Sequence, residues 1–309
     1  MQTTLQTPLS VAGAGLHSGL PARVTLREAP AGTGVLFRRT DVVGRDPLVP
    51  ARWDRVEISP LNTRIVNEAG VHVSTIEHLM AALAGTGVSN AMVEIDGPEV
   101  PILDGSSALW ARAIQRAGLR GLDAPQEAVE VLRPVEVSDG LALARLEPAP
   151  GFAVSFAIEF PDAAIGRQSR ELDLAGRAFL HELCDSRTFC RAADLETMWS
   201  RGLALGGTPL NAVVVDGERV MTPGGWRHPD EAVRHKMLDA VGDLATAGLP
   251  ILGRYVGVRA GHAITNRLLR ALLAQPDAWR RVTCDAATLA RLPGIGVRGG
   301  DLAGLPAVA

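Results

Sequence analysis

The chain has 309 residues, of which 47% are hydrophobic and 21% charged, and its formal net charge is −3. The length favours two domains, the composition excludes a disordered chain, and the charge excludes a global basic field that would attract nucleic acid. Three cysteines without a CxxC spacing predict a reducing, cytoplasmic location rather than a disulfide framework. Neither a secretory signal nor an apolar run of roughly 18–20 residues occurs, so we expect no transmembrane segment.

In the first part of the chain, extended segments with glycine-rich turns are expected up to residue 40. A helix is predicted in STIEHLMAALAG, where Ser74 can cap the start and a glycine at 85 or 87 can stop it. The strand NAMVEI and the helix ALWARAIQRAG follow. Residues 119–128 lack periodicity, which places a domain boundary there and gives a first domain of residues 1–122.

In the second part, VEVSDGLALARLEP and FAVSFAIEF predict strands, and Asp216-Gly217 predicts a hairpin within NAVVVDGERV. Pro229 opens the longest helix, which Gly248 can end. The strand ILGRYVGV then leads to a last amphipathic helix, ITNRLLRALLAQ. We assign residues 123–290 to a second domain and expect 291–309, rich in glycine, proline and alanine, to be a loosely ordered tail.

Both parts show the same order: strands, a helix with a histidine near its start, a strand and a second helix. This order suggests a distant duplication. The predicted fold class is therefore α+β, with two similar domains that each pack a mainly antiparallel sheet on two helices.

The longest predicted helix places three polar side chains among apolar ones. His235 and Asp239 are four residues apart and share a helix face, and Asp243 lies one turn further. Histidine nitrogens and a carboxylate are zinc ligands, and a catalytic zinc site keeps one position open for water. An isolated pair of this kind is more often a surface His–Asp contact, so this motif alone is weak.

Other candidates are individually ambiguous. Glu77-His78 can place a base beside a metal ligand, but Ser74 and Glu77 also fit a capping box. His262, after Gly261 at a strand-to-helix transition, can face a cleft or be incidental. The segment Ser186–Phe189 offers a hydroxyl beside a cation, or a turn with capping residues. His17 has no companion ligand nearby, which favours a structural or supporting role.

Taken in order, five motifs resemble those of the UDP-3-O-acyl-N-acetylglucosamine deacetylases, which carry out the committed step of lipid A synthesis in Gram-negative bacteria. The resemblance runs from about Gly13 to Asp285, and several long motifs in the right order are far more specific than one. The motifs are STIEHLMAALAGTGVSNAMVEIDGPEVPILDGSS, DSRTF, SRGLALGG, VRHKMLDAVGDL and AGHAITNRLL.

The resemblance implies zinc-dependent removal of an acetyl group from a UDP-linked, acylated amino sugar. It also implies that His78, His235 and Asp239 hold Zn²⁺, that Glu77 is the general base and that His262 works with it. The family fold has two similar domains, each with a small insert, and the active site lies between them. We expect a monomer without a nucleic-acid partner.

The remaining roles also come from the resemblance. Asp243 matches the carboxylate that orients the catalytic histidine, and Thr188 matches the hydroxyl that stabilises the oxyanion. Lys236 matches a lysine near the sugar and phosphates, and Phe160 would stack on uridine, although the residues after it depart from the family pattern. Arg259 stands where some members have lysine and would serve the diphosphate.

The second insert is expected to form an apolar passage for the acyl chain near residues 190–212. Phe189 and Gly207 are candidate substrate-binding positions there. Gly206 and Gly207 have no side chains and would let an acyl chain pass close to the backbone. A non-catalytic nucleotide- or nucleic-acid-binding module and a zinc amidase for another N-acetyl sugar remain as alternatives.

Overall fold

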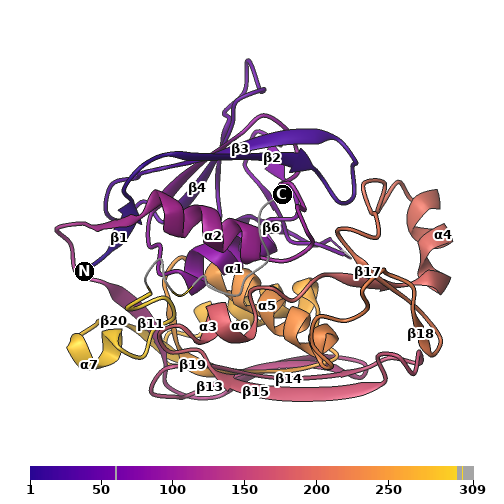
Figure 1. The fold of residues 1–309 in the computed structure, drawn as a ribbon. Coiled ribbons are helices and arrows are strands. Elements are labelled where there is room, and N and C mark those ends of the chain that lie inside the picture. The colour runs from indigo at the N-terminus through magenta and orange to yellow at the C-terminus, as the bar shows by residue number, and fades with distance from the viewer. Residues whose placement is uncertain (60, 298–300, 302–309) are drawn as a thin grey trace.

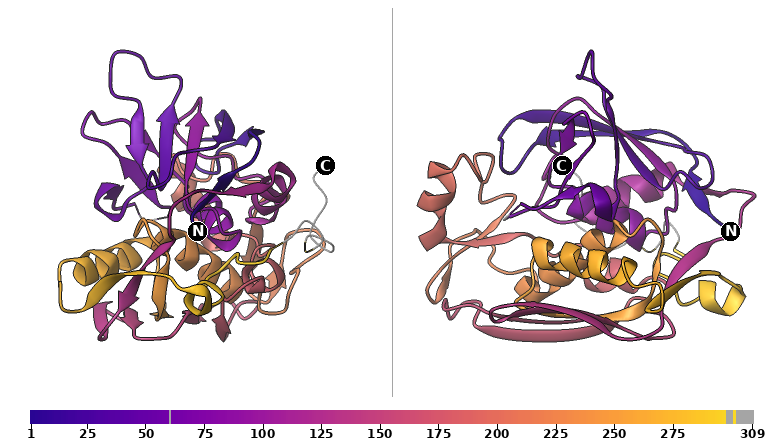
Figure 2. Two further views of the ribbon diagram at one scale, coloured as in Figure 1. Left: turned by 90° about the vertical axis from the view of Figure 1, so that its left-hand side faces the viewer. Right: turned by 180° about the vertical axis from the view of Figure 1, so that it is seen from behind.

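In the computed structural model, which describes residues 1–59, 61–297 and 301, two sheets enclose a layer of helices (Figures 1 and 2). The first sheet has the strand order β2-β3-β9-β4-β5, and all pairs are antiparallel except β9 with β4. Its strands are β2 Leu9–Ala14, β3 Pro21–Arg27, β9 Ala91–Ile95, β4 Val35–Arg39 and β5 Leu48–Pro50.

The second sheet repeats this order as β12-β13-β19-β14-β15, again with one parallel pair, β19 with β14. Two more strands extend this sheet: β11 pairs in parallel with β19, and β20 pairs antiparallel with β11. The equal strand orders agree with the predicted duplication. The strands are β12 Val135–Asp139, β13 Ala142–Glu147, β19 Ile251–Val258, β14 Phe152–Glu159, β15 Arg167–Asp173, β11 Glu127–Val131 and β20 Trp279–Thr283.

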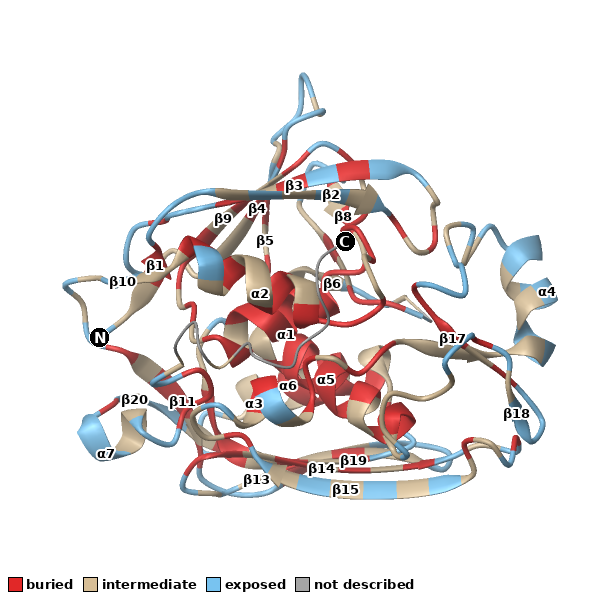
Figure 3. Ribbon diagram, in the orientation of Figure 1, coloured by how far each residue is buried: buried red, intermediate tan, exposed pale blue. Residues whose placement is uncertain are grey.

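Four helices lie between the sheets, and most of their residues are buried there (Figure 3). The first half contributes α1 Glu77–Gly85 and α2 Ala108–Ala117, and the second contributes α5 Glu231–Ala245 and α6 His262–Leu273. The two halves have separate apolar cores. The predicted α+β class, with two helices on each mainly antiparallel sheet, is confirmed.

Each half carries a small insert between its fifth strand and its first long helix. The first insert contains β6 Val56–Glu57, β7 Arg64–Val66 and β8 His72–Val73, which follow the short helix η1 Trp53–Arg55. In the second half, this position holds α3 Ala178–Glu182, α4 Ala192–Ser200 and the strands β16 Phe189–Arg191, β17 Val213–Asp216 and β18 Arg219–Val220. The predicted hairpin is the β17–β18 pair.

Helices α1 and α5 cross in the middle of the molecule at Gly242. A Cβ atom on Gly242 would lie 2.0 Å from the backbone oxygen of Glu77, so only glycine permits this approach. The long helix α5 begins at Glu231, two residues after Pro229, and the chain turns away at Gly248, whose φ is +84°. The crossing brings side chains of both helices into one site.

Three short elements lie away from the helical layer or at the ends of the halves. Strand β1 Thr3–Leu5 pairs with β10 Leu119–Gly121, within the segment where we placed the boundary, and α7 is Ala286–Leu289. None of the helices in the described residues has the length and apolar composition needed to cross a bilayer.

Residues 291–297 differ from the expected loose tail. Leu292 is buried, its carbonyl accepts a hydrogen bond from the Gly176 backbone N–H, and the Gly294 N–H donates to the Gly176 carbonyl. These backbone bonds hold the segment against the second half. The rest of the predicted tail, 298–300 and 302–309, falls outside the described residues, and only Asp301 among the last residues is described.

Candidate active site

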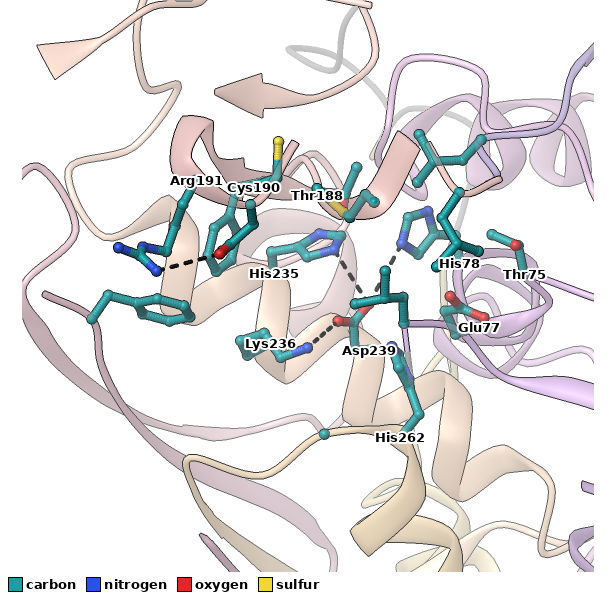
Figure 4. Close-up of a pocket in the computed structure, with 18 of the residues that line it drawn as sticks. Thr75, Glu77, His78, Thr188, Cys190, Arg191, His235, Lys236, Asp239 and His262 are labelled. Atoms are coloured by element: carbon teal, nitrogen blue, oxygen red, sulfur yellow. Dashed lines mark hydrogen bonds and ion pairs between the residues drawn. The ribbon is translucent and has the colours of Figure 1, made fainter. Parts of the chain in front are cut away.

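A cavity of about 450 Å³ opens where the two halves meet (Figure 4). The first half contributes residues of α1 and nearby loops, and the second half contributes its insert, α5 and the start of α6. The lining residues are Leu16, Leu61, Thr75, Glu77, His78, Phe160, Thr188, Phe189, Cys190, Arg191, Asp194, Thr197, Met198, Arg201, Leu203, His235, Lys236, Asp239, Gly261 and His262.

Three buried groups converge on one point of this cavity. The Nε2 atoms of His78 and His235 lie 3.5 and 3.3 Å from Oδ1 of Asp239, and the three ligand atoms form the one cluster suited to a metal ion among the described residues. That Oδ1 atom is buried and has no hydrogen-bond partner among the described residues. Such an orphaned carboxylate oxygen between two imidazoles fits a divalent metal better than a hydrogen-bond network.

The protonation states of these groups also suit a metal. Burial lowers the pKa of His235 to about 4, so its ring is neutral and offers a lone pair. The carbonyl of Ser186 lies 3.0 Å from Nδ1 of His235 and accepts its N–H, which leaves Nε2 free. Although burial opposes its charge, the Lys236 ammonium helps to hold the pKa of Asp239 well below its usual range.

Lys236 has a second contact with this cluster. Its ammonium donates to Oδ2 of Asp239 at 2.7 Å, and the opposing effects of burial and Asp239 leave its pKa raised. One carboxylate oxygen thus faces the histidines while the other is bound by the ammonium. Lys236 also lines the cavity, where its charge can face an anionic ligand.

Glu77 stands at the start of α1, beside His78. Its carboxylate accepts a hydrogen bond from the backbone N–H of Thr63 at 2.9 Å. The alternative capping-box interpretation is wrong, because α1 begins without a side-chain cap and Ser74 forms extended backbone pairs with Pro98 and Val100 instead. Burial raises the pKa of Glu77, with His262 opposing this, and a carboxylate with a raised pKa is better matched to accept a proton near neutral pH.

His262 begins α6 and contacts Asp243 of α5. Its Nδ1 lies 2.9 Å from Oδ2 of Asp243, so that N–H donates to the carboxylate and Nε2 is left for the cavity. Burial disfavours the imidazolium, but the negative charge of Asp243 outweighs it and raises the pKa of His262 to about 9. His262 is therefore charged at neutral pH.

Thr188 is held by backbone hydrogen bonds from both sides. Its N–H donates to the Gly105 carbonyl at 2.7 Å, and its own carbonyl accepts from Val213 at 2.8 Å. Gly105 must be glycine, because its φ is +83° and a Cβ atom would meet the Asn211 carbonyl oxygen at 2.1 Å. These bonds fix Thr188 at the cavity wall near the histidines.

Two aromatic rings line the cavity beyond the metal cluster. Phe160 and Phe189 pack edge to face with centroids 5.4 Å apart, and Phe189 also lies 6.2 Å from the His235 ring. The insert adds Cys190, Met198 and other residues to this wall. Aromatic and apolar surface of this kind suits a nucleobase or an acyl chain.

Two predicted substrate contacts lie elsewhere. Arg259 does not line the cavity and pairs with Glu159. Gly207 is also outside the lining, and the space beside Gly206 is filled by first-half backbone, since a Cβ there would lie 2.1 Å from the Gly15 oxygen. The wall of the insert that faces the cavity is instead formed by residues between Phe189 and Leu203.

Residues 2–274 match the model of the family described as UDP-3-O-acyl N-acetylglycosamine deacetylase. The chain belongs to this family. A relative with a closely matching name, UDP-3-O-acyl-N-acetylglucosamine deacetylase, from Phenylobacterium zucineum (strain HLK1) is 50% identical over 90% of this chain and 95% of its own length. Relatives of the same name from Anaeromyxobacter sp. (strain Fw109-5) and Idiomarina loihiensis are 47% and 46% identical, over 94% and 92% of this chain and 95% and 93% of theirs.

Membership in the deacetylase family confirms the resemblance. Two residues of the site, Thr63 and Thr75, were not predicted from the sequence. Thr63 contacts Glu77, and Thr75, at the cavity wall, has a φ of +57°, which is unusual for a β-branched residue. His17, which the sequence did single out as a structural or supporting residue, is buried, and its Nε2 has no hydrogen-bond partner among the described residues. No sequence signal marks Thr63 or the backbone of Thr75, because both depend on contacts between distant segments.

Proposed function

We propose that this chain removes the N-acetyl group of a UDP-3-O-acyl-N-acetylglucosamine, giving acetate and the free amine, the committed step of lipid A biosynthesis. The observation that carries the proposal is the convergence of His78, His235 and Asp239 in the cavity that Glu77 and His262 also line, in a chain of the deacetylase family. The substrate is the one named for the relatives.

The chain would hold one Zn²⁺ through two imidazole nitrogens and Oδ1 of Asp239. Three protein ligands of this type leave a position for water or substrate. When bound, the ion polarises the amide carbonyl and lowers the pKa of water. The buried, unpartnered Oδ1 atom and the neutral His235 ring support this assignment.

The other groups divide the proton transfers. Glu77 accepts the proton of the attacking water, and its raised pKa suits that task. His262, kept charged by Asp243, stabilises the developing negative charge and donates a proton to the departing amine. Thr188, fixed by its backbone bonds, supplies a hydroxyl for the oxyanion.

The substrate would use both walls of the cavity. Lys236 faces the sugar and phosphates, Phe160 stacks on the uracil, and Phe189 contacts the substrate, whose acyl chain lies against the insert. Arg259 and Gly207 do not line the cavity, so either residue would contact the substrate only in a different conformation of the chain. We also propose that the first domain ends at residue 122 and the second at residue 290, and that the protein is a cytoplasmic monomer.

The experiment is an acetate-release assay on zinc-loaded enzyme with two substrates, the acylated UDP-N-acetylglucosamine and the same sugar without its acyl chain. Rapid acetate release from the acylated sugar alone supports the proposal. Equal rates on both sugars would indicate an amidase for another N-acetyl sugar. Stoichiometric zinc with no acetate from either sugar would indicate a binding module and overturn the enzymatic assignment.

A further inference from the structure

Thr63 lies in the first insert just before β7, and its N–H, hydroxyl and carbonyl all form hydrogen bonds within the site. Its backbone N–H donates to Oε2 of Glu77 at 2.9 Å, and its hydroxyl donates to Oδ1 of Asp243 at 2.5 Å. Its carbonyl accepts a hydrogen bond from the N–H of Ile76, the residue before α1, at 3.2 Å. Thr63 is only 3% exposed, so these groups have no competing water.

The hydroxyl bond acts on the carboxylate that orients the catalytic histidine. Nδ1 of His262 lies 2.9 Å from Oδ2 and 3.1 Å from Oδ1 of Asp243, and Oδ1 also receives the Thr63 hydroxyl. A carboxylate held at both oxygens cannot rotate about its last bond without losing one of them. The Thr63 hydroxyl therefore fixes the direction in which Asp243 holds the His262 ring.

The loop around Thr63 is anchored independently of these bonds. The side-chain amide of the preceding residue, Asn62, donates to the Thr75 hydroxyl at 3.2 Å, and that hydroxyl donates to Glu99 at 2.9 Å. The backbone of Thr75 is in the left-handed region, a strained conformation that persists only where surrounding contacts enforce it. The position of Thr63 is thus set by the fold and not by its bonds to Asp243 and Glu77 alone.

We propose that Thr63 is a positioning residue that fixes the base, Glu77, and the acid, His262, relative to each other. It is the single described residue whose hydrogen bonds reach both the Glu77 carboxylate and the Asp243–His262 pair. This inference rests on the proposed deacetylase function. Thr63 belongs to the first half and Asp243 to the second, so it also ties the two halves together at the reacting centre.

The test replaces the hydroxyl without changing the side-chain shape. In zinc-loaded enzyme, Thr63→Val keeps the N–H bond to Glu77 and loses the bond to Asp243, so kcat should fall by about 10–100-fold, as for other groups that orient a metal site, with KM and zinc content unchanged. Thr63→Ser keeps the hydroxyl and should restore most of kcat. In an Asp243→Asn background, Thr63→Val should add little, because both changes act on the same contact.

The matched control is Thr246→Val, which removes another buried threonine hydroxyl bonded to the same residue. The Thr246 hydroxyl donates to the backbone carbonyl of Asp243 at 2.6 Å and not to its carboxylate. This control should lower the thermal midpoint and leave kcat near that of the parent. If Thr63→Val does not fold, Thr63→Ala removes the same hydroxyl with less bulk and takes its place.

Three outcomes overturn the inference while the parent enzyme releases acetate: an unchanged kcat in Thr63→Val, equal losses in the Val and Ser variants, or a change confined to KM. Failure of the proposed function has a different signature, since the parent itself would then release no acetate. A loss of kcat in Thr63→Val with retention in Thr63→Ser and in the Thr246 control supports the inference.

Discussion

Helices α1 and α5 occupy equivalent places in the two halves, yet they contribute differently to the site. The nine-residue α1 brings Glu77 and His78 in its first turn, whereas the 15-residue α5 brings His235, Asp239 and Asp243 along successive turns. Neither helix holds a complete metal set. The comparison shows that the repeated architecture supplies a scaffold, and that the chemistry arises only where the unlike helices cross.

The second helices of the two halves differ in the same sense. In the first half, Ser107 precedes α2, and its hydroxyl donates to the backbone carbonyl of His78 at 2.7 Å. In the second half, α6 begins with His262, whose ring faces the cavity. Under the proposed function, one helix start therefore supports a metal ligand, while its counterpart carries a proton-transfer group.

The largest expected effect comes from removing one ligand from either half. His78→Ala and His235→Ala should each reduce zinc to well below one ion per chain and abolish acetate release, because two ligands hold the ion poorly. Metal analysis and the acetate assay check this. The controls are His72→Ala and His181→Ala, which alter histidines outside the site in the first and second halves. Both variants should keep their zinc and their acetate release. Full activity in thoroughly metal-free parent enzyme would contradict the prediction.

A smaller loss should follow from removing the proton-transfer group of either half. Glu77→Gln and His262→Ala should each lower kcat by roughly 10²–10⁴-fold, the usual contribution of general acid–base catalysis, while zinc stays bound. Single-turnover rates with parallel zinc analysis measure this. Loss of zinc in Glu77→Gln would show that this residue supports the metal and is not simply the base.

The pH dependence of the rate should distinguish the proton-transfer group of the first half from that of the second. The pKa of His262 is about 9, so its imidazolium is present below that pH and the rate should fall as pH rises through it. Asp243→Asn removes the charge that raises this pKa, so the loss of rate at high pH should move to lower pH. In His262→Ala this alkaline loss of rate should be absent. The acid limb of the pH–rate profile is expected to belong to Glu77, because burial raises its pKa from the ordinary value. An alkaline limb unchanged in His262→Ala would assign it to another group, such as Lys236.

The smallest effect concerns the crossing itself. Gly242→Ala would place a Cβ atom against the backbone oxygen of Glu77, so we expect a loss of about 1–3 kcal/mol in the free energy of unfolding, as for other overpacked sites. Denaturant unfolding measures it. Gly121→Ala is the control, since its new Cβ would be 3.6 Å from the nearest side chain. Equal stabilities of the two variants would show that the helices can separate at no cost.

Much of the architecture could be predicted from local patterns. Strand β14 alternates buried and less buried residues, and the expected hairpin turns at Gly217 and Glu218, directly after Asp216. Glycine and proline signals placed the end of α5 correctly, since they act within a few residues. The family motifs predict roles for Glu77 and His262 and predict the metal ligands, all of which the spacing of single residues had left ambiguous.

The sequence by itself therefore determined the secondary structure elements, the fold class and the family, because these depend on periodicity and on long ordered motifs. Only the tertiary structure decided that Glu77 does not cap its helix, that Arg259 lies away from the cavity and that Thr63 bonds to both Glu77 and Asp243. Thr63 and Asp243 are 180 residues apart in the chain. A contact over that distance depends on how closely two helices pack at one glycine, and no local pattern encodes that geometry.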